Sequence, residues 1–128
     1  MPAPATLADA RLLSPDALTA PLAGDPDGTA AGGADGGPMP TASATLTAGE
    51  DGTGSWEIGL WEAAPGTDVD VEADELFVVL AGRGTVRFDD GSELALRPGV
   101  VVRLRAGDRT TWTVTEALRK LYVLLPAG

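Results

Sequence analysis

The chain has 128 residues, the length of one domain, which leaves no room for a second large core. Its formal net charge of −10 makes binding to nucleic acid or to an anionic membrane surface unfavourable, so we expect neither as a partner. The absence of histidine and cysteine excludes disulfide bonds, thiolate nucleophiles and metal sites built from imidazole or sulfur. We find no signal-peptide pattern and no apolar run of about 20 residues, so we expect a cytoplasmic protein.

Residues 1–54 are expected to form an N-terminal arm that is partly flexible. The segment 12–18 predicts a capped turn of helix, because Ser14 precedes Pro15 at the first helical position. Residues 23–40 are rich in Ala, Gly, Pro and Asp. Ordering such a run costs about 1–2 kcal/mol per residue and buries little apolar surface. We therefore predict a flexible loop or linker over residues 23–40.

From residue 55 to residue 128 the pattern changes to short strands separated by turns. Trp56, Ile58 and Leu60 alternate with other positions, which predicts a half-buried strand. Further strands are predicted over residues 76–80, 85–88, 94–96, 100–104, 112–114 and 118–125. Turns fall about every 8–12 residues, the spacing typical of an antiparallel sandwich or barrel. The pattern predicts an all-β barrel domain over residues 55–128, with almost no helix.

Acidic residues precede the strand predicted over residues 76–80 at a regular spacing. Asp68 and Asp70 are separated by one residue, and Glu75 stands seven residues before Gly82. This arrangement resembles the first motif of the cupins, in which two histidines separated by one residue precede such a glutamate. Asp68 and Asp70 occupy the two histidine positions.

The stretch from Arg97-Pro98-Gly99 to Ala106-Gly107 resembles the second cupin motif, and Thr110 stands about where that motif has a third histidine. The resemblance covers residues 56–126 and implies a single antiparallel jelly-roll barrel. Because cupins generally pair through strand exchange or sheet packing, it also implies a homodimer.

Three longer segments resemble one cupin subgroup, which includes the ureidoglycine aminohydrolase cupin domain and the ethanolamine-utilisation cupins. These segments are residues 59–66 (GLWEAAPG), 74–76 (DEL) and 111–122 (TWTVTEALRKLY). Two positions depart from the second motif, with Val100 in place of an aspartate and Arg105 in place of a proline.

Asp68, Asp70 and Glu75 are the candidate metal ligands. Their oxygen atoms suit Mn, Mg or Ca better than zinc or iron, so these residues are assigned to a metal only if one is bound. Carboxylates that lie close together without a metal raise one another's pKa and can act as general acid and base. The alternative interpretation is an acidic, solvated loop that leads into a strand. No other cofactor is expected.

Lys120 is the one lysine of the chain, and together with Glu75 it forms the candidate catalytic pair. It shares a strand face with Leu118 and Tyr122. If that face is interior, the ammonium needs a partner such as Glu75, Glu62 or Glu116. A buried lysine can also bind an anion or act as a base or Schiff-base amine. The alternative is an exposed position on the strand.

Trp61, Glu62, Trp112 and Tyr122 are the candidate ligand-binding residues. Ligand pockets are mostly apolar with a few placed polar groups, and these aromatic rings could line the mouth of a barrel. The alternative is that the rings belong to the core or to a subunit interface.

Three functional hypotheses remain open at this point, and whether the protein is an enzyme stays undecided. The favoured hypothesis is a cupin that binds a small polar metabolite without a metal. The second is an enzyme of ureide or amine metabolism that uses a carboxylate-bound divalent metal. The third is a structural or regulatory barrel with no ligand. A binder or enzyme requires an open pocket where Glu75, Trp112 and Lys120 converge, whereas a structural barrel requires that space to be filled.

Overall fold

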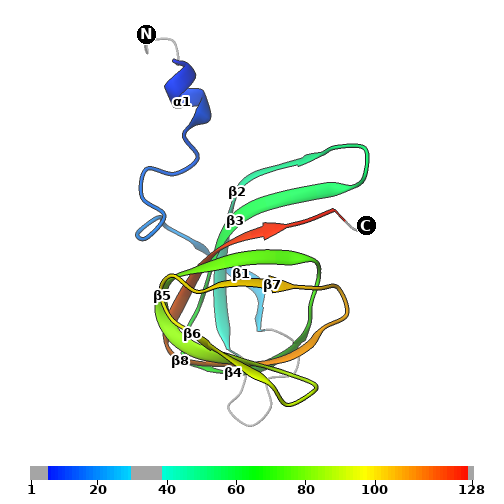
Figure 1. Ribbon diagram of the computed structural model, residues 1–128. Helices are drawn as coiled ribbons and strands as arrows, with labels where there is room; N and C mark the ends of the chain where they lie inside the picture. The colour runs from blue at the N-terminus through cyan, green and yellow to red at the C-terminus, as the bar shows by residue number, and fades with distance from the viewer. Residues whose placement is uncertain (1–5, 30–38, 127–128) are drawn as a thin grey trace.

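The computed structural model describes residues 6–29 and 39–126, and these residues form one short helix and eight antiparallel strands. The strands curl into a barrel, as Figure 1 shows. This architecture confirms the all-β barrel expected from the sequence. In chain order, the elements are α1 (Leu7–Arg11), β1 (Ala23–Thr29), β2 (Pro40–Glu50), β3 (Ser55–Ala63), β4 (Gly66–Val71), β5 (Glu75–Phe88), β6 (Glu93–Leu96), β7 (Val101–Leu104) and β8 (Arg109–Leu124).

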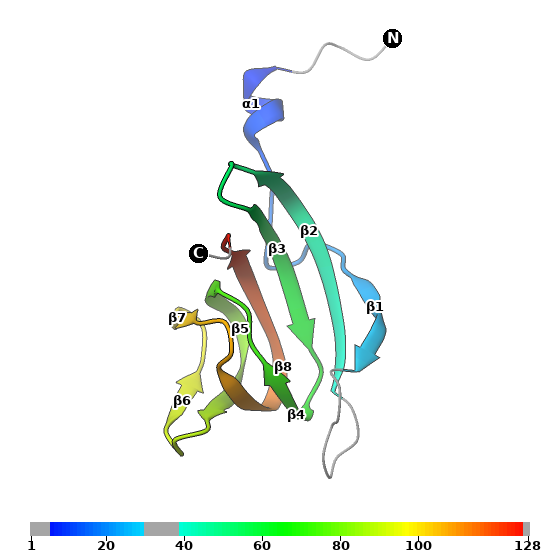
Figure 2. The ribbon, with the colours of Figure 1, turned by 90° about the vertical axis from the view of Figure 1, so that its right-hand side faces the viewer.

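Strands β5 and β8 form the centre of the sheet. The strand order is β1-β2-β3-β8-β5-β6, while β4 pairs with β8 and β7 pairs with β5. The first half of β8 pairs with β4 and its second half with β3, so these two strands share one edge of β8. Because β5 and β8 bend strongly along their length, the sheet folds over on itself and encloses one core, as the two views of the ribbon show (Figures 1 and 2).

The bend in β5 depends on bulges and on one glycine. The register between β5 and β8 shifts three times between Val79 and Gly84. Bulges of this kind bend a strand and increase its twist. Gly82 has a φ of 90°, and a Cβ atom there would lie 2.6 Å from Leu118 Cα. Only glycine lets the two backbones approach so closely at this point.

The core lies between the two halves of the folded sheet. Its side chains come from the loop before β2 and from strands β3, β5, β6, β7 and β8, and each is at most 9% exposed. They alternate with exposed side chains along β7, where Val102 and Leu104 are buried and Val101 and Arg103 are exposed. The core cluster comprises Met39, Ala63, Phe77, Val79, Val86, Leu96, Val102, Leu104, Trp112, Val114, Leu118 and Tyr122.

Most of the predicted strands are confirmed, but two pairs of them merge. The strands predicted at 76–80 and 85–88 are parts of β5, and those at 112–114 and 118–125 are parts of β8. Residues 81–84 do not form a turn, because Ala81 pairs with Arg119 and Arg83 with Glu116 across the bulges. The predicted turns at residues 90–91, 97–99 and 106–108 are all present.

The N-terminal region differs from its prediction. The helix is α1, capped by Thr6, and the turn that follows is organised by Asp16 rather than Ser14, with Asp16 O accepting from Ala20 N at 3.0 Å. Strand β1 occupies part of the expected loop, and β2 pairs with β3 along its length. Backbone pairing supplies hydrogen bonds even where side chains bury little surface. Residues 30–38, in the same expected loop, lie outside the described part. The boundary at residue 54 stays a prediction.

Arg119 of β8 holds the segment between α1 and β1 against the barrel. Its guanidinium group donates to Ala17 O at 3.0 Å and to Ala20 O at 2.9 Å, and it pairs with Glu62 at 3.3 Å. Helix α1 itself has no buried residue and stands away from the barrel in both views (Figures 1 and 2). No helix in the described residues is long and apolar enough to cross a membrane.

Candidate functional site

A cavity of about 330 Å³ lies inside the barrel. Strands β2, β3, β4, β5 and β8 and the segment between β4 and β5 contribute its wall. The cavity brings together side chains that are far apart in the sequence, including seven of the eight predicted site residues. Its lining residues are Met39, Thr41, Ser43, Trp61, Asp68, Val69, Asp70, Glu72, Glu75, Trp112, Lys120, Tyr122 and Leu124.

Lys120 and Glu75 form a buried ion pair in the wall of the cavity. Lys120 Nζ lies 2.6 Å from Glu75 Oε2, and the two side chains are 8% and 11% exposed. The ammonium group also lies 4.7, 4.6 and 4.9 Å from the ring centroids of Trp61, Phe77 and Trp112. An ammonium ion is attracted to the faces of aromatic rings at such distances. The positive charge of Lys120 is therefore matched by one carboxylate and three rings.

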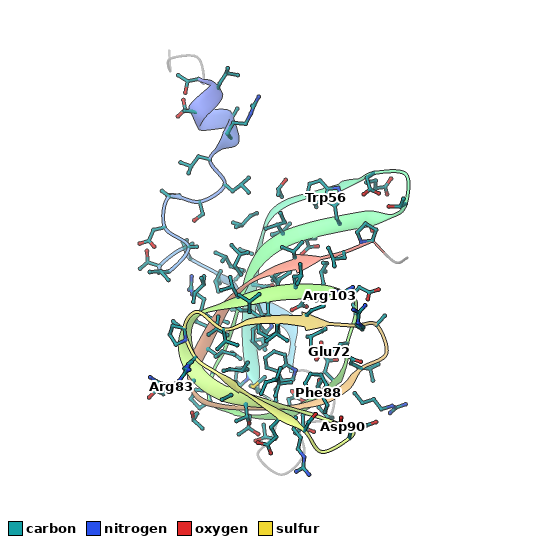
Figure 3. The ribbon with its side chains drawn as sticks, in the orientation of Figure 1. Trp56, Glu72, Arg83, Phe88, Asp90 and Arg103 are labelled. Atoms are coloured by element: carbon teal, nitrogen blue, oxygen red, sulfur yellow. The ribbon has the colours of Figure 1, made fainter. Side chains whose placement is uncertain are left out.

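Glu72 is a site residue that the sequence interpretation missed. It follows β4 and is labelled in Figure 3, inside the ring of strands. Its Oε2 accepts hydrogen bonds from Thr110 Oγ1 at 2.6 Å and from Trp112 Nε1 at 2.9 Å. These bonds fix the Trp112 ring in the cavity wall. The sequence signal that could have identified Glu72 is the two-residue repeat of a strand, because Asp68, Asp70 and Glu72 stand at alternate positions.

Asp68 and Asp70 project from β4 into the same cavity, but their surroundings differ. Asp68 is 1% exposed, and only its Oδ1 has a hydrogen bond, from Val69 N at 2.8 Å. Asp68 Oδ2 is buried and has no hydrogen-bond partner among the described residues. Asp70 is exposed, which places it at the mouth of the cavity. The partial burial of its carboxyl group, followed by the negative charge of Glu72, raises the pKa of Asp70.

Tyr122 lines the cavity, but its hydroxyl group donates a hydrogen bond to Glu57. Glu57 also accepts a hydrogen bond from Thr45 at 3.2 Å. Burial and the bond to Glu57 raise the pKa of Tyr122 above its ordinary value of 10.0. Tyr122 reaches Glu57 by crossing Gly59, where a Cβ atom would lie 2.6 Å from its ring. Tyr122 is therefore a neutral, oriented part of the wall.

A family comparison agrees with this architecture. Residues 48–122 match the model of the EutQ-like cupin domain. The chain belongs to this family. The match covers strands β3 to β7 and parts of β2 and β8, and these strands contribute most of the cavity wall. No curated protein matches the chain.

Solved structures share the fold of this EutQ-like cupin. The Clostridium difficile EutQ protein has a TM-score of 0.58 at 19% identity, over 70% of this chain and 70% of that chain. A protein of unknown function from Rhizobium leguminosarum has a TM-score of 0.58 at 26% identity, over 68% and 82%. A protein of unknown function from Pseudomonas syringae has a TM-score of 0.65 at 23% identity, over 84% and 46%.

Two observations bear on the residues expected at the site of this EutQ-like cupin. Glu62 does not line the cavity; it pairs with Arg119, while Glu116 pairs with Arg83. Of the three carboxylates considered, Glu75 is therefore the ion-pair partner of Lys120 among the described residues. In the part of the chain that the structure describes, no three acidic side chains form a group that could hold a metal ion. Asp68, Asp70 and Glu75 line one cavity, and their assignment to a bound metal stays a prediction.

Proposed function

We propose that this EutQ-like cupin binds a small polar metabolite inside its barrel without a metal ion. The observation that carries the proposal is the open space of about 330 Å³ where Glu75, Trp112 and Lys120 converge. Sites for small molecules are commonly concave, about 300–1,000 Å³ in volume, and lined by apolar rings with a few polar groups. A purely structural barrel would fill this space with leucine, valine and phenylalanine.

The fixed orientation of the polar groups supports binding. Glu75 is held by Lys120, Trp112 by Glu72, and the Tyr122 hydroxyl by Glu57. Side chains that are already ordered lose little conformational entropy when a ligand arrives. The cavity is therefore prepared for a ligand of limited size and defined polarity.

Lys120 and Glu75 are the two cavity residues that we propose contact the bound molecule first. The pair is joined by a direct hydrogen bond and borders the cavity. In our proposal its first role is to position the ligand, and proton transfer remains a capacity of the same two groups. The homodimer and the cytoplasmic location stay predictions.

A ligand screen with a blocked cavity tests the proposal. We would screen cationic, neutral and anionic small metabolites by thermal shift and follow the indole N–H signals of isotopically labelled protein by NMR. Trp61 and Trp112 line the cavity, so a bound metabolite should shift their signals. Trp56 does not line it and lies on the β2–β3 hairpin in Figure 3, so its signal is an internal control.

Substitutions of two serines complete the test. Ser43→Phe places a ring in the cavity, whereas Ser55→Phe places one at the exposed start of β3. Binding that is lost in Ser43→Phe and kept in Ser55→Phe would support the proposal. If no compound of any charge gives a saturable shift, or if Ser43→Phe binds as well as the unchanged protein, the proposal is wrong.

A further inference from the structure

The cavity contains more negative than positive charge. Four carboxyl groups and one ammonium group line it. The ammonium group of Lys120 is already paired with Glu75 at 2.6 Å. Glu72 accepts hydrogen bonds from two uncharged donors. Within the described residues, Asp68, Asp70 and Glu72 have no lysine or arginine nitrogen within ion-pair distance.

Asp68 provides a second and independent observation. Its side chain is almost fully buried in the cavity wall, and Oδ2 has no hydrogen-bond partner in the described structure. A buried polar atom without a partner costs about 1–3 kcal/mol, and more when it is charged. A donor on a bound molecule would remove this cost. Asp70 lies two residues further along the same face of β4, so the same molecule can reach both carboxylates.

The aromatic wall already accommodates positive charge. Lys120 Nζ lies within 4.9 Å of three ring centroids. A second cation beside Trp61 or Trp112 would meet the same favourable π faces. An anion would find no unpaired cationic side chain among the described lining residues. A cation that enters the cavity would also decrease the repulsion between the carboxylates that line it.

From these contacts we propose that the cavity selects a small organic cation, an alkylammonium or guanidinium group, whose N–H donors bind Asp68 and Asp70. The inference rests on the proposed function of the barrel as a ligand site. It defines the ligand class: one positively charged nitrogen group that donates hydrogen bonds, and a short apolar part that packs against the rings. A cavity of about 330 Å³ limits the ligand to a small molecule.

Four compounds of similar size test the charge preference. We would titrate propylammonium, methylguanidinium, propionamide and propionate into the full chain at pH 7 by calorimetry. We expect at least one of the two cations to bind saturably, at least tenfold more tightly than propionamide, and propionate not to bind. If propionamide or propionate binds in the cavity as tightly as the cations, the inference is wrong.

Substitutions then test the assigned residues. Asp68→Asn keeps the shape of the side chain and removes its charge, and Asp70→Asn does the same at an exposed position where folding is less sensitive. We expect each to weaken cation binding at least tenfold. Glu93→Gln removes an exposed carboxylate of β6 outside the cavity and serves as the matched control. Cation binding that persists unchanged in both aspartate variants would overturn the assignment.

The two proposals fail in different ways. If the metabolite screen finds a neutral or anionic ligand that Ser43→Phe blocks, while neither cation binds, the barrel is a ligand site and only the cation inference is wrong. If no compound of any charge binds, both proposals are wrong.

Discussion

Replacing Lys120 by methionine should strongly destabilise the protein, because it leaves Glu75 buried without its partner. The Glu75 side chain is 11% exposed, and its one ion-pair partner within the described residues is Lys120 at 2.6 Å. Removing one member of a buried ion pair commonly costs about 3–5 kcal/mol. Methionine keeps the packing of the long side chain against Trp61, Phe77 and Trp112. We therefore expect Lys120→Met to lower the free energy of unfolding by about 3 kcal/mol or more at pH 7.

A double-mutant cycle separates the pair from its surroundings. In Glu75→Gln the charge is lost and the shape is kept, so the double variant should lose less stability than the sum of the two single variants. We expect a coupling energy of about 1–3 kcal/mol, measured by urea unfolding followed by circular dichroism. The matched control is Arg83→Met with Glu116→Gln, an ion pair at 4.0 Å with side chains 60% and 67% exposed. Exposed pairs usually contribute less than about 1 kcal/mol. A Lys120–Glu75 coupling as small as that of the control pair would refute this reasoning.

Three further predictions concern other parts of the molecule. Asp70→Asn should raise the melting temperature at pH 7, because the raised pKa of Asp70 means that the fold disfavours its ionised form. This gain in melting temperature should shrink as the pH falls through the raised pKa and vanish below the ordinary value of 3.8. An unchanged or lower melting temperature at pH 7 would contradict the prediction. Gly82→Ala should lower the free energy of unfolding by more than about 3 kcal/mol, because the new Cβ atom would lie 2.6 Å from Leu118 Cα. The control Gly91→Ala, with φ of 86° and open space around the residue, should lower it by only about 1–2 kcal/mol. Equal losses in urea unfolding would be inconsistent with a backbone clash at Gly82. Arg119→Met should release the segment between α1 and β1, so the Ala20 amide should exchange its hydrogen at least tenfold faster while the core amides of β8 stay protected. Unchanged hydrogen exchange at Ala20 would show that Arg119 does not hold the segment.

Local sequence patterns predicted the elements whose physical cause lies within a few residues. The alternation from Trp56 to Leu60 marks β3, and the burial of Val102 and Leu104 follows from the same period of two. The turns at residues 90–91 and 97–99 follow from glycine and proline, which favour the required backbone angles. The spacing of Glu75 and Gly82 indicated the family, and the family model confirms it.

Features that depend on distant partners were predicted less well. The sequence of residues 81–84 does not indicate that pairing with β8 continues through the bulges, so β5 was predicted as two strands. The sequence of residues 23–29 contains few apolar residues, and strand β1 is defined by its backbone pairing with β2. Of the three carboxylates considered as partners for Lys120, Glu75 forms the ion pair, although Lys120 is opposite Val79 in the pairing of β5 with β8.

The sequence by itself determined an acidic, all-β domain of the cupin type without imidazole or thiolate ligands, because composition, alternation and turn residues act locally. The tertiary structure decided what the site is. It formed the open cavity, placed Glu72 against Trp112, and left Asp68 Oδ2 without a partner in the described residues. Lys120 and Glu75 are 45 residues apart in the chain, and Lys120 is opposite Val79 rather than Glu75 in the pairing of β5 with β8. The two side chains meet because both face the cavity of the closed barrel, where the long lysine side chain reaches the carboxylate.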